Sequence, residues 1–151
     1  MSEPDPDKAL LERAYSLETE SETRALYRDW AASYDQTMLS GLKYLTPAKT
    51  AAMLEREVED RNALVLDVGC GTGLAGENLA ALGFSTIDGM DYCAEMLDTA
   101  RAKQHGGKPV YQRLIEADLT LHLPVADQTY DHMICTGTFT HAHVGAEALR
   151  E

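Results

Sequence analysis

The residues best suited to bind a ligand form a glycine-rich segment that follows a short apolar run. The segment reads LVLDVGCGTG over residues 64–73, with Gly69, Gly71 and Gly73 at alternate positions and Asp67 just before them. Glycines in a turn between a strand and a helix let backbone groups approach a nucleotide closely, because no side chain intervenes. The segment therefore predicts a nucleotide site, and its details indicate which class of nucleotide fits.

The spacing of the glycines separates three classes of nucleotide ligand. A dinucleotide fold uses G-x-G-x-x-G, whereas this chain has G-x-G-x-G, and Gly76 fits only a looser dinucleotide pattern. A phosphate-binding loop ends in Gly-Lys-Ser/Thr, but no lysine lies between Lys49 and Lys103. A carboxylate at Asp67 suits an ammonium or sulfonium group better than a pyrophosphate. The pattern favours a sulfonium nucleoside and leaves a dinucleotide as the less favoured alternative.

The composition limits the partners that such a site can have. The chain has 151 residues and a formal net charge of −12, which argues against nucleic acid and anionic membranes, because both require basic surface. Its three cysteines, Cys70, Cys93 and Cys135, form neither a disulfide framework nor a Cys-x-x-Cys metal pattern. The N-terminal residues contain no apolar stretch of signal-peptide or membrane-spanning length. We expect a cytoplasmic protein of one domain that binds no metal.

Alternating strand and helix patterns indicate the elements that position the glycine turn. Apolar runs predict strands, and the segments between them have helical spacing. The expected strands cover residues 63–69, 84–91, 109–118 and 130–137, and the expected helices cover 74–82, 92–104 and a helix begun at 145. This order predicts a mostly parallel α/β sheet with helices on both faces, whose ligands bind beyond the carboxyl ends of the strands.

The two ends of the chain differ from this regular core. We expect residues 1–8 to be disordered and residues 9–29 to follow a helical pattern. A second helix is expected to start with Thr46 as its N-cap and Pro47 as its first residue. Residue 151 falls within a helical pattern soon after the fourth strand. We therefore expect a sheet truncated after that strand, with an open edge that favours a homodimer.

Several segments, in the same order along the chain, resemble the class I S-adenosylmethionine-dependent methyltransferases. LDVGCGTG at residues 66–73 is similar to motif I of that family, and STIDGMDYCAEML at 85–97 is similar to its second strand and following helix. EADLTLHLPVADQTYDHMICTGTF at 116–139 resembles the third motif region. With WAASYD at 30–35, the resemblance is closest to small-molecule methyltransferases of the ubiquinone-biosynthesis type and to methyltransferase-like proteins of the Williams–Beuren region.

The resemblance covers roughly residues 27–148 and implies a Rossmann-like methyltransferase sheet with a site for S-adenosylmethionine. It implies that residues 9–60 form a helical lid over the cofactor and that residues 61–151 form a cofactor-binding core, incomplete at its C-terminus. Asp67 is expected to hold the methionine end, Asp91 the ribose hydroxyls, and Asp118 the adenine amino group. The full set of expected cofactor contacts is Tyr34, Asp67, Gly69, Gly71, Gly73, Asp91, Tyr92, Met96, Asp118, Leu119 and Thr136.

The reaction that this resemblance implies is in-line transfer of a methyl group from S-adenosylmethionine to a small molecule, with S-adenosylhomocysteine as product. The segment CTGTFT at residues 135–140 stands where enzymes that methylate nucleobase amino groups usually have an Asn/Asp-Pro-Pro-Tyr/Phe turn. His141 and His143 follow it and are candidates for a general base. The alternatives are a non-catalytic S-adenosylmethionine-binding module and, from the glycine pattern alone, a dinucleotide-dependent reductase.

Overall fold

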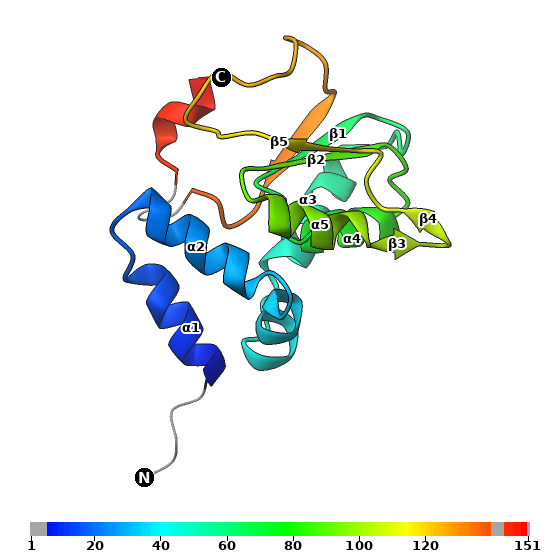
Figure 1. Ribbon diagram of the computed structural model, residues 1–151. Coiled ribbons are helices and arrows are strands. Elements are labelled where there is room, and N and C mark those ends of the chain that lie inside the picture. Colours follow the sequence, from blue (N-terminus) through cyan, green and yellow to red (C-terminus); the bar gives the residue numbers. More distant parts are fainter. Residues whose placement is uncertain (1–5, 140–143, 151) are drawn as a thin grey trace.

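A parallel four-stranded sheet forms the centre of the computed structural model, which describes residues 6–139 and 144–150 (Figure 1). The strands are β1 (Val65–Val68), β2 (Ile87–Asp91), β5 (Arg113–Glu116) and β6 (His132–Cys135), in the order β5-β2-β1-β6. Asp67 of β1 lies opposite Gly89 of β2 and Ile134 of β6. A strand forms within each of the four expected segments. Because all of them are parallel, their carboxyl ends meet at one edge of the sheet, where ligands bind in such folds.

The α-helices of the core lie on one face of the sheet, whereas the sequence pattern predicts helices on both faces. Helices α3 (Thr46–Glu57), α4 (Leu74–Ala81) and α5 (Ala94–Arg101) share one buried apolar cluster with the strands. Two right-handed crossovers that run in the same direction along a sheet place their helices on the same face. The opposite face is covered by the segment 117–130 and by the 3₁₀-helix η2 (Ala146–Arg150), because the long return from β5 to β6 contains no α-helix.

The segment before β5 differs from the single strand predicted over residues 109–118. Gly106 and Gly107 adopt φ values of +59° and +76° and turn a small antiparallel hairpin, β3 (Gln104–His105) with β4 (Lys108–Pro109). Such values are accessible to glycine at low cost, which explains why the turn forms there. Tyr111 then enters the core, and β5 begins only at Arg113. The short hairpin thus places the Tyr111 ring in the buried apolar cluster between the sheet and the helices.

The N-terminal region contains two α-helices where the sequence pattern suggested one. Helix α1 (Pro6–Tyr15) begins before residue 9, so that residues 6–8 are helical, and α2 (Glu20–Trp30) follows a short break. The break arises because Thr19 caps α2: its hydroxyl accepts from the Glu22 amide, and the Glu22 carboxylate accepts from the Thr19 amide. A π-helix, η1 (Gln36–Gly41), then leads to α3, which begins at Thr46 with Leu45 as its N-cap in place of the expected Thr46.

Strand β6 lies at the edge of the sheet and pairs only with β1 among the described strands. The side chain of Met133 in this strand is 66% exposed. An apolar edge strand of this kind is a template for pairing with another chain. Dimerisation through this edge stays a prediction. Within residues 6–139 and 144–150, no helix is both long enough and apolar enough to cross a membrane.

Candidate functional site

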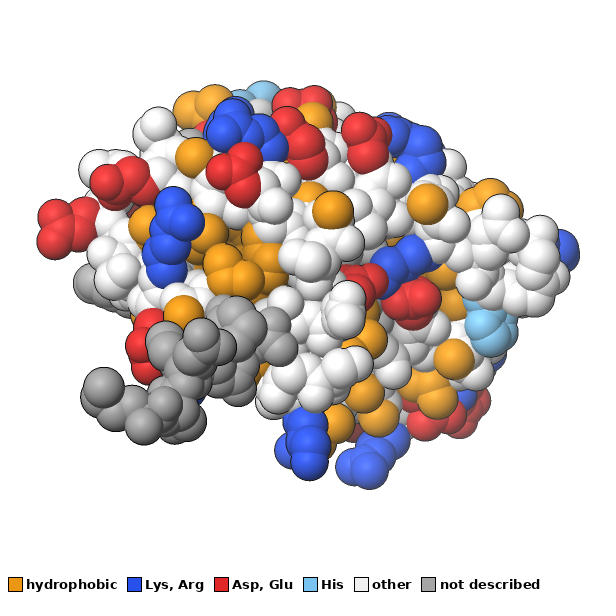
Figure 2. All heavy atoms as spheres, turned by 60° about the horizontal axis from the view of Figure 1, so that its bottom comes forward, with side chains coloured by type: hydrophobic (Ala, Val, Ile, Leu, Met, Phe, Trp, Pro, Cys, Tyr) orange, Lys and Arg blue, Asp and Glu red, His pale blue; other side chains and the backbone are white. Residues whose placement is uncertain are grey.

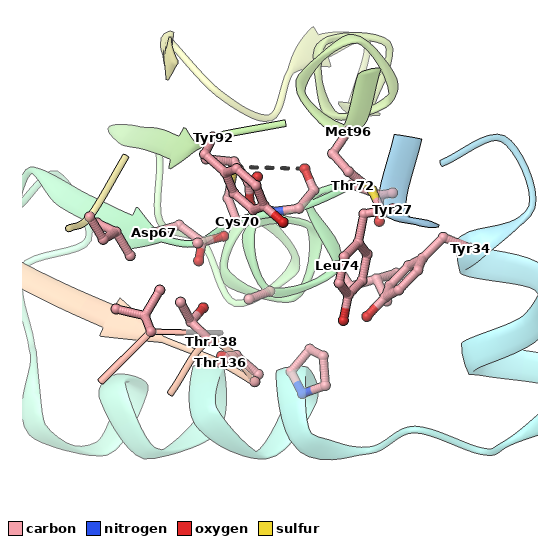
Figure 3. Close-up of a pocket in the computed structure, with 18 of the residues that line it drawn as sticks. Tyr27, Tyr34, Asp67, Cys70, Thr72, Leu74, Tyr92, Met96, Thr136 and Thr138 are labelled. Atoms are coloured by element: carbon pink, nitrogen blue, oxygen red, sulfur yellow. Dashed lines mark hydrogen bonds between the residues drawn. The ribbon is translucent and has the colours of Figure 1, made fainter. Parts of the chain in front are cut away.

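A cavity opens where the carboxyl ends of the strands meet, between the strand ends and helix α2 (Figure 3). It encloses about 1060 Å³ of empty space, its open mouth included. The strand ends and the loops after them supply most of the lining on the core side, with the first residues of α3, α4 and α5. Helix α2 and the residues between it and α3 line the other side. Of the expected cofactor contacts, those that line the cavity are Tyr34, Asp67, Gly69, Gly71, Asp91, Tyr92, Met96, Asp118, Leu119 and Thr136.

Two glycines of the turn line the cavity, and each has its own reason to lack a side chain. Gly69 has a φ of +65°, and a Cβ there would lie 2.0 Å from Oγ1 of Thr138, so glycine is required for the loop after β6 to approach. Gly71 has a φ of +53°, and a Cβ there would meet no protein atom within 4 Å. A side chain at Gly71 would therefore occupy the cavity itself. This arrangement is typical of a turn that lies directly against a ligand.

Gly73 is the one expected contact that does not line the cavity. It adopts a φ of +93° as the N-cap of α4, and a Cβ there would lie 2.8 Å from Cε2 of Tyr111. The absence of a side chain at Gly73 makes room for the buried Tyr111 ring. Contact of Gly73 with a cofactor stays a prediction, but the structure gives this glycine a packing role. His141 and His143, the candidate bases, lie outside the described residues.

The carboxylate of Asp91 joins the end of β2 to the glycine turn. Its Oδ2 accepts a hydrogen bond from the Gly71 amide at 2.8 Å, and its Oδ1 accepts one from the Cys93 amide at 2.9 Å. The side chain is buried, which raises the pKa of Asp91, while the amides of Cys93 and Gly71 oppose that rise by stabilising the charged form. The Tyr92 backbone also stabilises the charged form, and a carboxylate can accept about four hydrogen bonds in all. Asp91 can therefore fix the turn and still accept hydroxyl groups from a ligand.

Asp67 is a second buried carboxylate in the same cavity. Its Oδ2 accepts a hydrogen bond from the Tyr111 hydroxyl at 2.7 Å, and its Oδ1 has no hydrogen-bond partner in the described part of the chain. Burial raises the pKa of Asp67 to about 7, although the Tyr111 hydrogen bond lowers it. The Tyr92 hydroxyl and Thr136 Oγ1 are likewise buried without a described partner. Unpaired buried polar atoms that line one cavity indicate that a polar ligand completes their hydrogen bonding.

Aromatic side chains from the N-terminal region form the wall opposite the strand ends. Tyr27 and Tyr34 lie side by side and direct their hydroxyls the same way (Figure 3). The buried Trp30 packs edge-on against Tyr34, with ring centroids 4.9 Å apart. Burial raises the pKa of Tyr27 to about 12 and also raises that of Tyr34, so both are neutral hydroxyls near pH 7. The WAASYD segment thus supplies both core and lining: Trp30 packs inside, and Tyr34 faces the cavity.

Asp118 and Leu119 lie in the loop after β5, and both line the cavity. The Asp118 carboxylate accepts hydrogen bonds from the Thr120 amide at 2.8 Å and from the Thr120 hydroxyl at 2.6 Å. This local turn fixes the loop, because the side chain replaces a backbone acceptor. Leu119 is 8% exposed and packs against Leu66 and Met90 of the sheet. The loop therefore presents an ordered carboxylate and backbone at the cavity edge.

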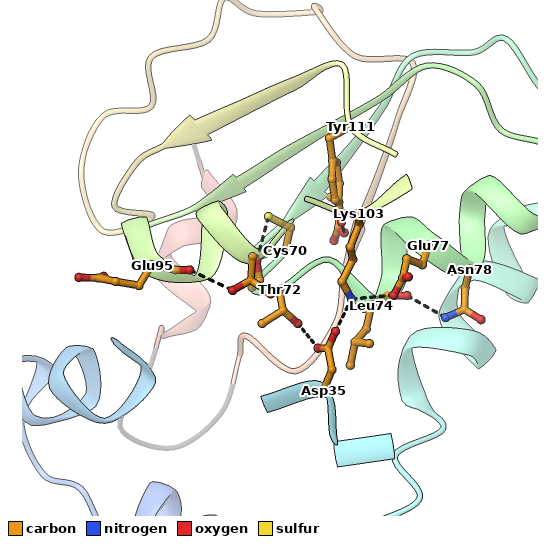
Figure 4. A network of polar contacts seen from close by, with 12 residues as sticks. Asp35, Cys70, Thr72, Leu74, Glu77, Asn78, Glu95, Lys103 and Tyr111 are labelled. Atoms are coloured by element: carbon orange, nitrogen blue, oxygen red, sulfur yellow. Dashed lines mark hydrogen bonds and ion pairs between the residues drawn. The ribbon is translucent and has the colours of Figure 1, made fainter. Parts of the chain in front are cut away.

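A partly buried ion-pair network joins the N-terminal region to the core (Figure 4). The Asp35 carboxylate accepts from the Thr72 hydroxyl and pairs with the Lys103 ammonium group, which also pairs with Glu77 of α4 at 2.6 Å. The Lys103 side chain is only 10% exposed. The network links residues that are 68 positions apart, at Asp35 and Lys103. It holds the segment after α2 against the glycine turn through Asp35 and Thr72. A lid formed by residues 9–60 stays a prediction.

Replacing Lys103 with methionine is expected to lower the free energy of unfolding by about 2 kcal/mol, because Asp35 and Glu77 would be left without their shared cation. Urea denaturation measures this change, and limited proteolysis should cut faster within residues 31–45. Arg101→Met is the matched control, since Arg101 pairs with Asp98 on the exposed surface of α5. The Arg101→Met control should lower the free energy of unfolding by less than about 0.5 kcal/mol. Equal losses for the two variants would contradict a role for Lys103 in anchoring residues 31–45.

Several lining residues were not identified by the sequence analysis. The sequence carried a signal for Tyr27, since it lies seven residues before Tyr34, a spacing that would place both on one face of a continuous helix. In the structure α2 ends at Trp30, but the two rings still pack together. Tyr44, Thr138 and Val144 line the cavity with no local pattern that could have identified them. The described residues contain no group of three or more His, Cys, Asp or Glu side chains that could hold a metal ion. The site is therefore built from carboxylates, hydroxyls, aromatic rings and exposed backbone.

Comparison with known proteins gives a consistent set of relatives. The family model described as "Methyltransferase domain" matches residues 65–151. Human methyltransferase-like protein 27 is 31% identical over 147 residues, which are 95% of this chain and 58% of that protein. A ubiquinone/menaquinone biosynthesis C-methyltransferase of Bdellovibrio bacteriovorus is 32% identical over 85% of this chain and 54% of its own length. The chain thus spans little more than half the length of these curated relatives.

Solved structures resemble the fold over most of the chain. A candidate S-adenosyl-L-methionine-dependent methyltransferase of Methanococcus maripaludis matches with a TM-score of 0.66 at 18% identity, over 82% of this chain and 56% of that one. A chain in the complex between the Haloferax volcanii Trm112 methyltransferase activator and a candidate methyltransferase matches with a TM-score of 0.52 at 26% identity, over 80% of this chain and 48% of that one.

Proposed function

Because this chain belongs to the family of methyltransferase domains, we propose that it binds S-adenosylmethionine in the cavity and transfers its methyl group to a small molecule. The observation that carries the proposal is the pair of buried carboxylates, Asp67 and Asp91, at the ends of adjacent strands in one cavity. Oδ1 of Asp67 is buried there without a described partner, which suits an ammonium group and opposes a pyrophosphate. The same observation disfavours the dinucleotide alternative.

Each lining group has a proposed part in holding this cofactor. Asp67 and the backbone of Gly69 hold the ammonium group of the methionine portion, with Tyr34 beside it. Asp91 accepts the ribose hydroxyls, since its backbone contacts to Gly71, Cys93 and Tyr92 do not use all the acceptor positions of a carboxylate. Further contacts to the nucleoside are proposed from Tyr92, Met96, Asp118, the Leu119 amide and Thr136.

The chain's contribution to the reaction is positioning and the exclusion of water. Bound S-adenosylmethionine supplies an electrophilic methyl group on its sulfonium. The aromatic side chains of Tyr27 and Tyr34, anchored through the Asp35–Lys103 pair, close the cavity from above and keep water from the reacting end. A nucleophile held in line with the methyl group needs no further covalent step from the protein. His141 and His143 stay candidates for accepting a proton from the acceptor.

The acceptor that fits this cavity best is a small molecule without strong negative charge. Among the described lining residues, Asp67, Asp91 and Asp118 are acidic, and none is basic. Figure 2 shows a face on which Lys and Arg side chains are scattered among Asp and Glu. A net charge of −12 without a concentrated basic surface there disfavours nucleic acid as the acceptor. The names of the quinone-biosynthesis relatives support a small-molecule acceptor in the same way.

Calorimetric titration with S-adenosylhomocysteine and with NAD tests the proposal. We expect S-adenosylhomocysteine to bind and NAD to give no heat of binding. Binding of NAD alone would overturn the proposal. Incubation with methyl-labelled S-adenosylmethionine and a metabolite mixture then tests for turnover. Binding without transfer of label would favour the alternative, a non-catalytic S-adenosylmethionine-binding module.

We also propose that the protein acts in the cytoplasm. Cys70, Cys93 and Cys135 are free thiols, and the first two are buried. Burial raises the pKa of each of these two thiols, which keeps them protonated near neutral pH. Unpaired cysteines of this kind are typical of proteins in a reducing compartment.

A further inference from the structure

We propose that Tyr111 is a positioning residue: its hydroxyl holds the Asp67 carboxylate so that Oδ1 is left facing the cavity, ready to accept the ammonium group of the cofactor. The inference rests on the proposed function, because it assigns that ammonium group to Asp67. The two residues are 44 positions apart, and the hydrogen bond between them is 2.7 Å long and buried. Tyr111 itself does not line the cavity and therefore acts only through Asp67.

The Tyr111 ring reaches Asp67 through a slot formed by three glycines: Gly73 and Gly76 at the start of α4, and Gly89 of β2. A Cβ at Gly73 would lie 2.8 Å from Cε2 of Tyr111, and one at Gly76 would lie 2.3 Å from its hydroxyl oxygen. A Cβ at Gly89 of β2 would lie 3.0 Å from Cε1 of the same ring. Any side chain at Gly73 or Gly76 would thus require the ring to move. Gly73, the third glycine of the G-x-G-x-G segment, therefore makes room for the Tyr111 ring. This role does not require Gly73 to contact a ligand.

The hydrogen bond divides the two oxygens of Asp67 between two tasks. Oδ2 is occupied by the Tyr111 hydroxyl, and Oδ1 is the buried atom without a described partner. Side-chain torsions of a lone buried carboxylate are free to exchange the two oxygens, and a fixed donor on one of them removes that freedom. The ammonium group of the cofactor can then bind Oδ1 of Asp67 without any rotation of the carboxylate. Tyr111 also favours the ionised form, because a donated hydrogen bond stabilises the negative charge.

Two hydrogen bonds favour the ionised form of Asp67: the one from the Tyr111 hydroxyl has the larger effect, and the one from the Gly76 backbone has the smaller. Asp91 approaches from the end of β2 and raises the pKa of Asp67, as burial does to a larger extent. Cys70 in the glycine turn and Cys135 of β6 also face Asp67, and burial raises the pKa of both thiols, so they are neutral near pH 7. The Tyr111 hydroxyl is neutral as well, since burial raises its pKa well above 10. Removal of that hydroxyl should therefore raise the pKa of Asp67 further.

The test is titration of the Tyr111→Phe variant with S-adenosylhomocysteine over a range of pH. For the wild-type chain, binding should strengthen as the pH rises through about 7, because Asp67 then becomes ionised. The phenylalanine ring still fills the glycine slot, but the hydroxyl is gone. We expect binding about tenfold weaker at pH 7, with the midpoint of the pH profile moved about one unit higher. A purely structural role for Tyr111 would not move that midpoint.

A second ligand and a matched variant make the result specific. 5′-Methylthioadenosine shares the nucleoside but lacks the ammonium group, so Tyr111→Phe should bind it as the wild type does. Tyr130→Phe removes a similar bond, from the Tyr130 hydroxyl to Asp88 Oδ2 at 2.9 Å, outside the cavity lining. That variant should leave the pH midpoint for S-adenosylhomocysteine unchanged.

The outcomes separate this inference from the proposed function. If the wild-type chain binds neither ligand, the proposed function fails and the inference fails with it. If the wild type binds S-adenosylhomocysteine and Tyr111→Phe binds it equally, with the same midpoint, the proposed function stands and the role of Tyr111 is overturned. Equal weakening of both ligands in Tyr111→Phe would also overturn it, since the loss would then come from the general shape of the site.

Discussion

Replacing Asp91 with alanine is expected to weaken S-adenosylhomocysteine binding by roughly a thousandfold, which removes it from the range of calorimetry. Two effects add. The proposed hydrogen bonds from the ribose hydroxyls are lost, and hydrogen bonds to a charged group are the stronger kind. In addition, the amides of Gly71 and Cys93 lose the acceptors that they reach at 2.8 and 2.9 Å, so the glycine turn is no longer fixed to the end of β2.

The measurement is an isothermal titration, with thermal unfolding of the same sample to verify that the variant is folded. Asp98→Ala is the matched control, because Asp98 is an acidic residue of the neighbouring helix α5 whose side chain is 70% exposed and pairs with Arg101. The control should bind S-adenosylhomocysteine as the wild type does. A folded Asp91→Ala variant with unchanged affinity would refute the assignment of the ribose to this carboxylate.

Replacing Gly71 with alanine is expected to weaken the binding of S-adenosylhomocysteine by roughly thirtyfold. This is the effect of forcing one methyl group into a site that the ligand fills. The methyl group would meet no protein atom within 4 Å, so it would project into the cavity. A second cost is backbone strain, because the φ of +53° is unfavourable for a residue with a Cβ. This strain lowers the stability of the fold by about 1 kcal/mol and is separate from the effect on binding.

Gly106→Ala separates these two costs. Gly106 has a φ of +59°, and a Cβ there also meets nothing within 4 Å, but it lies in the β3–β4 turn and does not line the cavity. Both variants should lose a similar amount of stability in urea denaturation, whereas only Gly71→Ala should lose affinity for S-adenosylhomocysteine. If the two variants bind equally well, the ligand does not lie against the glycine turn.

The sequence by itself determined the sheet and most of the proposed binding residues. Continuous apolar runs identify strands buried on both faces, and a glycine turn with a preceding acid is a local pattern, so neither depends on distant residues. Asp67, Gly71 and Asp91 therefore line the cavity as expected. The carboxyl ends of parallel strands must share one edge, and this is why residues far apart in the chain could be assigned to one site from the sequence alone.

The tertiary structure alone decided which side chains support those residues. Nothing in the local sequence pairs Tyr111 with Asp67, or Lys103 with Asp35, because these contacts depend on how the hairpin and the N-terminal region pack against the core. For the same reason, Gly73 matched a ligand-binding motif in the sequence but packs against Tyr111 in the fold. Local patterns fix backbone conformation and strand order, whereas the partner of a buried polar group is set by long-range packing.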